Sequence, residues 1–326
     1  MRAFAVCLLL FATAAHARST PRSEVEGVAD AIANRYFDAA RGLQIAQGLR
    51  EAAKAGAFDG DTEPEALAAE LTRRLEPLDH HFRVSWAPRG EGQDGPLVPR
   101  NGPARDHDTG IRDVAVLAGN IGYLFLGQFA DFEFGRADQP ARQAIDAALR
   151  QLSGTAAVII DVRDNGGGSP HMVGYLVSAF VPPTAEIYNV FHDRDGSTFS
   201  EAPAQAYAHP RTKVPLYILI NAHTVSAAES FAYTLQSAKR ATVVGGSSGG
   251  AANPGMSVPT PEGFEVFVPT GSPVNPITHT NWEGRGVTPD VPAENSAALE
   301  TAITLACKAA KIQACKQRET MGPPLP

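Results

Sequence analysis

Apolar residues in the middle of the chain form short continuous runs that alternate with amphipathic segments. The runs at 156–161 and 216–220 are almost entirely apolar, a pattern typical of strands buried on both faces of a parallel sheet. Each run precedes a segment with apolar residues at helical spacing, at 172–180 and at 226–238. This alternation of strand and helix predicts an α/β domain.

The same periodicities predict the other elements of this domain. They are strands at 114–117 and 121–126 paired around 118–120, a helix at 136–152, strands at 186–190, 241–244 and 264–268, and a closing helix at 297–316. No internal repeat is visible in the sequence.

The region before this domain has helical spacing throughout. Apolar residues cover 23–57 at this spacing, and Gly42 and Gly48 are expected to divide the stretch into two helices. A third helix is predicted at 66–75, and 81–86 alternates like a strand. We therefore expect a small helical unit ahead of the α/β domain.

The chain opens with the pattern of a secretory signal peptide. Arg2 supplies a positive charge, residues 6–15 are apolar, and Ala15-His16-Ala17 has the small residues of a cleavage site. The apolar run is too short to cross a bilayer as a permanent helix. We expect an exported protein, periplasmic or secreted, without stable membrane insertion.

A stretch rich in Gly, Pro and charged residues separates the two units. It runs from Arg89 to Thr109, has almost no apolar residues and is typical of a linker or mobile loop. The predicted domains are a signal peptide at 1–17, an N-terminal helical domain at 18–88, a linker or mobile loop at 89–110 and the α/β domain at 111–318.

Composition and charge exclude some functions. The hydrophobic fraction is 44% and the charged fraction 19%, which is ordinary for a globular protein. The net charge of −7, without any stripe rich in Lys and Arg, argues against a nucleic-acid partner.

The cysteines indicate neither a metal site nor, on balance, a disulfide. Cys307 and Cys315 would lie about 12 Å apart in a continuous helix, beyond the reach of a disulfide. No Gly or Pro lies between them to break the helix. No Cys or His pair has metal-ligand spacing, and we expect no metal and no cofactor.

Candidate catalytic residues lie in the turns that follow the apolar strands, where ligands bind in α/β sheets. The turn at 161–170 contains three consecutive glycines, whose backbone N–H groups are candidates for an oxyanion hole. The turn at 221–229 places Ser226 at the start of a helix, where free N–H groups and the helix dipole favour an alkoxide. Ser226 and Glu229 also form a capping box, and the local pattern alone favours this structural interpretation.

A third turn, at 245–250, contains a literal G-x-S-x-G centred on Ser248. That motif requires a helix after it, and the following residues include Pro254 and Gly255. We reject Ser248 as a nucleophile, and with it the main support for a lipase or esterase.

A serine nucleophile needs a base. His80 and His81 follow Asp79 and precede a predicted strand, whereas His223 lies near Ser226 with unpredictable geometry. No lysine has S-x-x-K spacing. Glu283 offers a carboxylate on a glycine-flanked turn.

Four ordered segments resemble motifs of the tail-specific (C-terminal processing) peptidase family, in the branch of tricorn core peptidases and interphotoreceptor retinoid-binding protein. The segments are Leu78-Asp79-His80-His81-Phe82, Asp161-Val162-Arg163 with Asn165-Gly166-Gly167-Gly168, Ser226-Ala227-Ala228-Glu229 with Arg240 to Gly245, and Gly286-Val287-Thr288-Pro289-Asp290. The likeness covers most of the mature chain. It implies a crotonase/ClpP-like ββα core with an N-terminal helical domain, and no stretch of the chain has room for a PDZ domain.

The resemblance also implies a role for each candidate residue. Ser226 matches the nucleophile, and the backbones of Ala227 and a glycine of the turn, Gly167, match the oxyanion hole. His81 matches the histidine base of the tricorn-like branch, and Glu283 matches its glutamate.

Two positions depart from one or other branch of the family. Ala251 stands where the processing peptidases have a lysine base, which excludes a serine–lysine dyad on this alignment. His80 stands where tricorn-like enzymes can have a serine, so its part is left open.

We therefore expect a serine peptidase that hydrolyses peptide bonds through an acyl-enzyme on Ser226, with peptide or protein substrates and no nucleic-acid partner. The alternative is a non-catalytic binding protein for retinoid-like or fatty-acid-like apolar ligands on the same scaffold. The sequence leaves open whether the chain forms a homo-oligomer.

Overall fold

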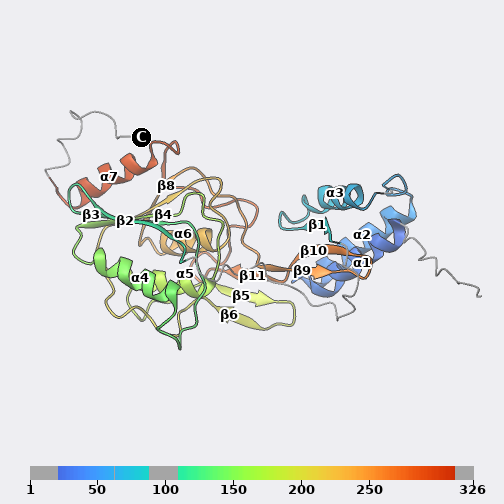
Figure 1. The fold of residues 1–326 in the computed structure, drawn as a ribbon, viewed down its shortest axis with the longest axis horizontal. Helices are drawn as coiled ribbons and strands as arrows, with labels where there is room; N and C mark the ends of the chain where they lie inside the picture. Colours follow the sequence, from blue (N-terminus) through green and yellow to red (C-terminus); the bar gives the residue numbers. More distant parts are fainter. Residues whose placement is uncertain (1–20, 62, 88–108, 313–326) are drawn as a thin grey trace, which may run out of the picture.

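The computed structural model describes residues 21–61, 63–87 and 109–312, which form two lobes side by side (Figure 1). The predicted signal peptide, nearly all of the predicted linker and Cys315 lie outside the described residues. Within the described ranges, no helix is long and apolar enough to cross a membrane.

The smaller lobe contains the three predicted N-terminal helices, α1 (Pro21–Arg35), α2 (Ala39–Lys54) and α3 (Pro64–Leu75). The break between α1 and α2 lies at Tyr36 to Asp38, where the Asp38 side chain caps α2 by accepting a hydrogen bond from Arg41 N. The predicted break at Gly42 and Gly48 was therefore wrong. A Cβ at Gly42 would lie 3.0 Å from Tyr36 Cβ, so this glycine allows close packing inside α2.

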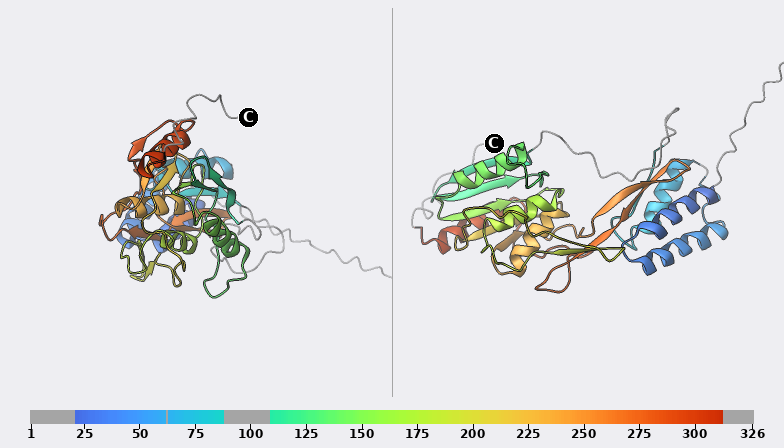
Figure 2. Two further views of the ribbon diagram at one scale, coloured as in Figure 1. Left: turned by 90° about the vertical axis from the view of Figure 1, so that its left-hand side faces the viewer. Right: turned by 90° about the horizontal axis from the view of Figure 1, so that it is seen from below.

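Three strands complete the helical lobe. β1 (Arg83–Trp86), β10 (Phe264–Pro269) and β9 (Gly255–Pro259) form an antiparallel sheet in the order β1-β10-β9. Their inward side chains share one core with the helices. Figures 1 and 2 show the orange β9–β10 hairpin beside the blue helices. A segment from the second half of the chain is thus part of the lobe that the sequence assigned to 18–88 alone.

The larger lobe is built on a six-stranded sheet in the order β12-β8-β7-β4-β3-β2. The strands are β2 (Ile111–Leu117), β3 (Ile121–Leu126), β4 (Ala157–Asp161), β7 (Leu216–Ile220), β8 (Thr242–Gly245) and β12 (Val291–Pro292). Only β2 runs antiparallel to its neighbour. The predicted α/β architecture and its buried strands are confirmed.

Helices cover both faces of this sheet. α4 (Pro140–Gln151), α5 (Pro170–Ser178) and α6 (Ala227–Ser237) pack on one face, and α7 (Ala298–Ala309) packs on the other. The side chains of β4 alternate between the faces, with Val158 and Ile160 towards α4–α6 and Ala157 and Ile159 towards α7. The helix predicted from residue 136 begins instead at Pro140, which occupies its first turn.

A small sheet lies between the two lobes (Figure 1). It has the order β11-β5-β6, formed by β11 (Gly271–Val274), β5 (Val190–Asp193) and β6 (Thr198–Ser200). β5 begins where the predicted strand 186–190 was expected to end, and β6, β9, β11 and β12 were not predicted. Two hydrogen bonds hold the α1–α2 corner. Phe37 N donates to Pro269 O at the end of β10 (3.0 Å), and the guanidinium of Arg194, directly after β5, donates to Tyr36 O (2.9 Å).

The end of α7 corrects the expectation for the cysteines. Cys307 is disulfide-bonded, and its partner lies outside the described residues. The helix ends in a Schellman motif: Lys311 has φ 54°, Ile312 N donates to Cys307 O (2.9 Å) and Lys311 N donates to Lys308 O (3.3 Å). The helix therefore ends before residue 310 without Gly or Pro, and the expected continuous helix to residue 316 was wrong.

Candidate active site

Three neighbouring parallel strands bring the predicted turns together. β8, β7 and β4 are adjacent, so the turns at their carboxyl ends lie at one edge of the sheet. Val225 N donates to Asn165 O (3.0 Å), and Gly249 N donates to Thr224 O (3.0 Å). The serine turn is thus hydrogen-bonded to the glycine turn on one side and to the 245–250 loop on the other.

Ser226 is exposed and precedes the first residue of α6. Its backbone has φ 57° and ψ −123°, whereas a helix-capping residue ordinarily has an extended backbone. A non-glycine residue in such a conformation is strained, and strain of this kind accumulates at functional sites. A sharp strand-to-helix turn that exposes a serine is also the geometry of a nucleophile elbow. A structural cap would not require this backbone, so the geometry favours the catalytic interpretation of Ser226.

Glu229 holds the serine turn against the glycine-rich loop. Its Oε2 accepts hydrogen bonds from Ser226 N (2.8 Å) and Ala251 N (2.8 Å), and its Oε1 accepts from Ser248 Oγ (2.5 Å) and Gly250 N (2.6 Å). Burial raises the pKa of this carboxyl despite the four donors. The capping-box glutamate therefore fixes two loops at once, a role that its sequence position alone did not reveal.

The glycine turn lies directly beside Ser226. A Cβ built at Gly167 would lie 2.7 Å from Ser226 Cβ and 3.2 Å from Ala227 N. Gly167 N, however, already donates to Asn165 Oδ1 (2.8 Å). Gly167 therefore lies beside Ser226, but its N–H group is engaged within the turn, and its oxyanion-hole role stays a prediction. Ala227 is the first residue of α6, where an N–H group has no acceptor within the helix.

The helical lobe contributes an imidazole with two carboxylates. His81 Nδ1 lies 3.0 Å from Asp79 Oδ1 and 3.4 Å from Glu283 Oε1. The side chains of His81, Asp79 and Glu283 are 13%, 3% and 22% exposed, so this group is largely shielded from water. The structure thus brings the predicted base and the predicted supporting acid together, and it adds Asp79.

Backbone and side-chain donors fix both carboxylates. Glu283 Oε2 accepts from Ala252 N (2.8 Å) and Asn253 N (3.1 Å), directly after the residue that bonds to Glu229. The loop at 250–253 therefore links the serine turn to Glu283 and, through it, to His81. Asp79 Oδ2 accepts from the hydroxyl of Tyr36 (3.0 Å) and from Asn253 Nδ2 (3.3 Å).

The electrostatics of His81 follow from these contacts. Burial disfavours the charged ring, but the hydrogen bonds and charges of Asp79 and Glu283 outweigh it and raise the pKa of His81 to about 9. Burial likewise opposes ionisation of Asp79, but hydrogen bonds from the side chain and backbone of His81 outweigh it and lower the pKa of that carboxyl. Burial and the neighbouring Asp79 charge raise the pKa of the Tyr36 hydroxyl.

Asp79, His81 and Glu283 also have ligand atoms within 4.8 Å of one another, close enough to hold a metal ion. In the structure, His81 Nδ1 contacts one oxygen of each carboxylate directly. The second oxygen of each carboxylate is bonded to other donors. This is the arrangement that a histidine–carboxylate relay requires.

Other candidates are not part of this cluster. His223 and His80 are exposed, and a Cβ at Gly284 would lie 3.9 Å from His80 Cδ2. Ser248 is buried, with its hydroxyl donating to Glu229 and accepting from Val287 N (2.6 Å), which supports its rejection as a nucleophile. Ala251 offers only its backbone to Glu229.

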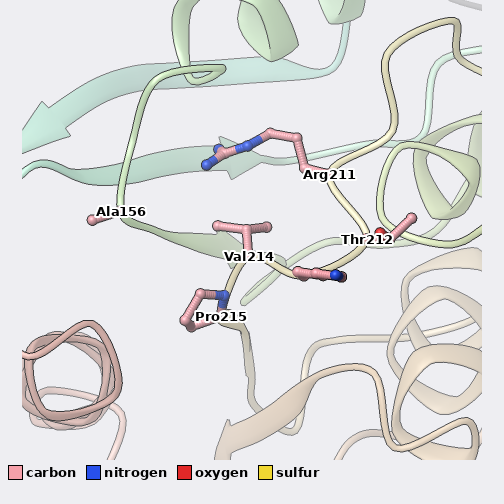
Figure 3. A pocket seen from close by; sticks show the side chains of 6 residues that line it. Ala156, Arg211, Thr212, Val214 and Pro215 are labelled. Atoms are coloured by element: carbon pink, nitrogen blue, oxygen red, sulfur yellow. The ribbon is translucent and has the colours of Figure 1, made fainter.

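A hollow of about 460 Å³ lies away from this cluster (Figure 3). It is lined by Ala156 and Arg211 to Pro215, which precede β4 and β7 and so lie at the opposite edge of the sheet from Ser226. The Arg211 guanidinium is bonded to Leu152 O (2.7 Å) and Thr155 Oγ1 (3.0 Å). The hollow is therefore separate from the candidate active site around Ser226 and His81.

Comparison with known proteins gives a family match. The family model described as Peptidase family S41 matches residues 120–293, more than half of the chain. The carboxyl-terminal-processing protease of Synechocystis sp. is 30% identical over 128 residues, which cover 39% of this chain and 27% of the relative. The matched parts span between 27% and 40% of the length of the curated relatives.

Solved structures share the fold. A candidate peptidase from Parabacteroides merdae has a TM-score of 0.62 at 19% identity, covering 88% of this chain and 97% of that one. The photosystem II D1 C-terminal processing protease has a TM-score of 0.52 at 16% identity, covering 91% and 99%. At such identities these likenesses concern the fold alone, and they extend over both lobes.

Proposed function

The chain belongs to peptidase family S41, and on this premise we propose that it hydrolyses peptide bonds with Ser226 as the nucleophile and His81 as the base. The observation that carries the proposal is the backbone of Ser226, which exposes its hydroxyl at a strained strand-to-helix turn. The loops that hold this turn also hold Glu283 beside His81.

The reaction follows from the two groups. The Ser226 oxygen attacks the carbonyl carbon of the peptide bond while the His81 ring accepts the hydroxyl proton. The carbonyl becomes an oxyanion beside Ala227 N, which stabilises the developing charge, and Gly167 N–H would join it only after release from Asn165 Oδ1. Collapse breaks the C–N bond, and the proton passes from His81 to the leaving amine. Water then releases the acyl group by the same steps, again with His81 as base.

A histidine-dependent mechanism fits this chain better than a lysine-dependent one. The position of the lysine base holds Ala251, whose backbone N–H is bonded to Glu229. Glu283 and Asp79 both face the His81 ring and favour the imidazolium that forms during attack. We therefore place the chain in the tricorn-like, histidine-dependent branch, with Glu283 as a supporting acid.

The proposed reaction indicates the class of substrate, and the first 17 residues indicate the compartment. A peptidase of this kind acts on peptides or proteins and needs no cofactor. The charged, apolar and small-residue order of the first 17 residues supports export, so we propose that these substrates are met in the periplasm or outside the cell.

Hydrolysis of a peptide library, with products identified by mass spectrometry, tests the proposal. Ser226→Ala is expected to reduce cleavage to the uncatalysed level. Ser247→Ala, at an exposed serine of the neighbouring glycine-rich loop, is the matched control and is expected to cleave normally. Unchanged cleavage by Ser226→Ala would reject this nucleophile. Absence of cleavage by the parent, with saturable fatty-acid binding in a tryptophan-quenching titration, would favour the carrier alternative.

A further inference from the structure

We propose that Asp79 is the residue that positions the His81 ring for catalysis, and that Glu283 places a second negative charge beside this ring without setting its orientation. The inference rests on the proposed function, because it concerns the base of that reaction. It assigns the orienting role to a carboxylate in the helical lobe, two residues before the histidine itself.

The contacts of His81 distinguish the two carboxylates. Asp79 Oδ1 lies 3.0 Å from His81 Nδ1 and also accepts a hydrogen bond from His81 N (2.9 Å). An aspartate that accepts from the backbone two residues later forms an Asx turn, which fixes its carboxylate relative to that residue. Glu283 Oε1 is further away, at 3.4 Å, and has no bond to the His81 backbone among the described contacts.

The remaining oxygen of Asp79 is held from both lobes. Tyr36, at the corner between α1 and α2, donates its hydroxyl to Oδ2, and Asn253 donates its amide from the loop after the glycine-rich turn. The Asp79 side chain is 3% exposed, against 22% for Glu283. Donors fix both carboxylates, but Asp79 is more buried, lies closer to Nδ1 and is bonded to the His81 backbone, so it determines the ring orientation more strictly than Glu283 does.

This geometry determines which ring nitrogen acts as the base. With Nδ1–H donated to Asp79, the lone pair of the neutral ring lies on Nε2, and Nε2 is then the nitrogen that accepts the Ser226 proton in the proposed reaction. The charged or titratable groups facing the ring are Asp79 and Glu283. Tyr36 is bonded to Asp79, and the charge of Arg41 acts on Tyr36.

Substitution of Asp79 by asparagine tests the assignment. An asparagine keeps the shape, but its amide can donate to Nδ1 and so moves the ring proton to Nε2. In histidine-¹⁵N-labelled protein carrying Ser226→Ala, NMR is expected to find the Nδ1–H tautomer of His81 above its pKa. Added Asp79→Asn should convert the ring to the Nε2–H tautomer, while Glu283→Gln should retain Nδ1–H with a lowered pKa. An unchanged tautomer in Asp79→Asn would overturn the inference.

Kinetics with Ser226 intact give the second readout. Asp79→Asn is expected to lower kcat about 10³- to 10⁴-fold, as loss of the orienting acid does in serine hydrolases. Asp59→Asn, the same change at an exposed aspartate of the same lobe, is the matched control and should retain full activity. A larger loss in Glu283→Gln than in Asp79→Asn would assign the role to Glu283 instead.

The two readouts separate this inference from the proposed function. The NMR experiment needs no catalysis, so a parent enzyme without peptidase activity would refute the function and leave the tautomer result decisive. If Asp79→Asn does not fold, Glu283→Gln alone decides, because loss of the Nδ1–H tautomer in that variant would contradict the role of Asp79.

Discussion

Alanine substitutions at the three consecutive glycines of the 166–168 turn are expected to have three different effects. Gly166 has open space where a Cβ would lie, with nothing within 4 Å. Gly167 has φ 101°, and its Cβ would lie 2.7 Å from Ser226 Cβ. Gly168 has φ 132°, and its Cβ would lie 2.1 Å from Phe129 O. One segment therefore provides a control, a catalytic test and a structural test.

The magnitudes follow from these contacts. Gly166→Ala should change the free energy of unfolding by less than about 1 kcal/mol, because no contact opposes the methyl group. Gly168→Ala should cost about 2 to 6 kcal/mol, from backbone strain of about 1 to 3 kcal/mol and the loss of up to two backbone bonds of about 0.5 to 1.5 kcal/mol each. Those bonds are Ser169 N to Phe129 O (2.7 Å) and Phe129 N to Gly167 O (2.8 Å).

Gly167→Ala should cost about 1 to 3 kcal/mol of stability for its backbone conformation. Its larger effect is on chemistry, because the methyl group displaces Ser226, and a shift of about 1 Å at a reacting atom costs about 100-fold in rate. Chemical denaturation measures the stabilities, and the rate of labelling by a serine-directed fluorophosphonate measures the reactivity of Ser226.

We expect Gly166→Ala to be labelled at the same rate as the parent. We expect Gly167→Ala to stay folded and to be labelled about 100-fold more slowly. Labelling of Gly167→Ala at the parental rate would refute the placement of this turn at the reacting group. Loss of labelling in Gly166→Ala would refute the argument from steric contact.

Three further predictions follow from the structure. First, kcat/KM should rise with pH through about 9 as His81 loses its proton, and Glu283→Gln should shift this rise to lower pH. A rise at the same pH in Glu283→Gln would exclude Glu283 as a cause of the raised pKa of His81. Second, the raised pKa of His81 stabilises the folded state by about 3 kcal/mol at most, fully below about pH 6.5, and this contribution is lost as pH rises through about 9. Denaturant unfolding across this pH range, with His81→Gln as the comparison, measures the loss. Third, Arg240→Ala should destabilise the α/β lobe by about 3 kcal/mol, because the guanidinium donates to Phe180 O, Arg211 O and Val214 O; a change below about 1 kcal/mol in thermal or chemical unfolding would contradict this.

Elements defined by local pattern were predictable from the sequence. The buried strands β4 and β7 have continuous apolar runs, and the turns after them are in the expected places. The order of four motifs then predicted that His81 and Glu283 would meet, although 202 positions separate their numbers, and the structure places them 3.4 Å apart. The family membership is confirmed by the match over residues 120–293.

Features that depend on distant parts of the chain were not predictable. β10 pairs with β1 across the chain, and nothing in the alternation of 264–268 indicates which lobe it joins. Gly42 was expected to break a helix, but its missing side chain serves a close contact with Tyr36. The proposed role of Asp79 could not be predicted from the D-x-H spacing of an Asx turn alone, because the sequence does not show the donors that hold its second oxygen.

Localisation of a covalent adduct by tandem mass spectrometry tests the central claim most directly. After reaction of the full chain with a fluorophosphonate, we predict one modified residue, Ser226, and a strongly reduced rate of modification in His81→Gln. Modification of Ser248 or another serine, or a rate unaffected by the loss of His81, would contradict a Ser226 hydroxyl activated by the imidazole of the helical lobe.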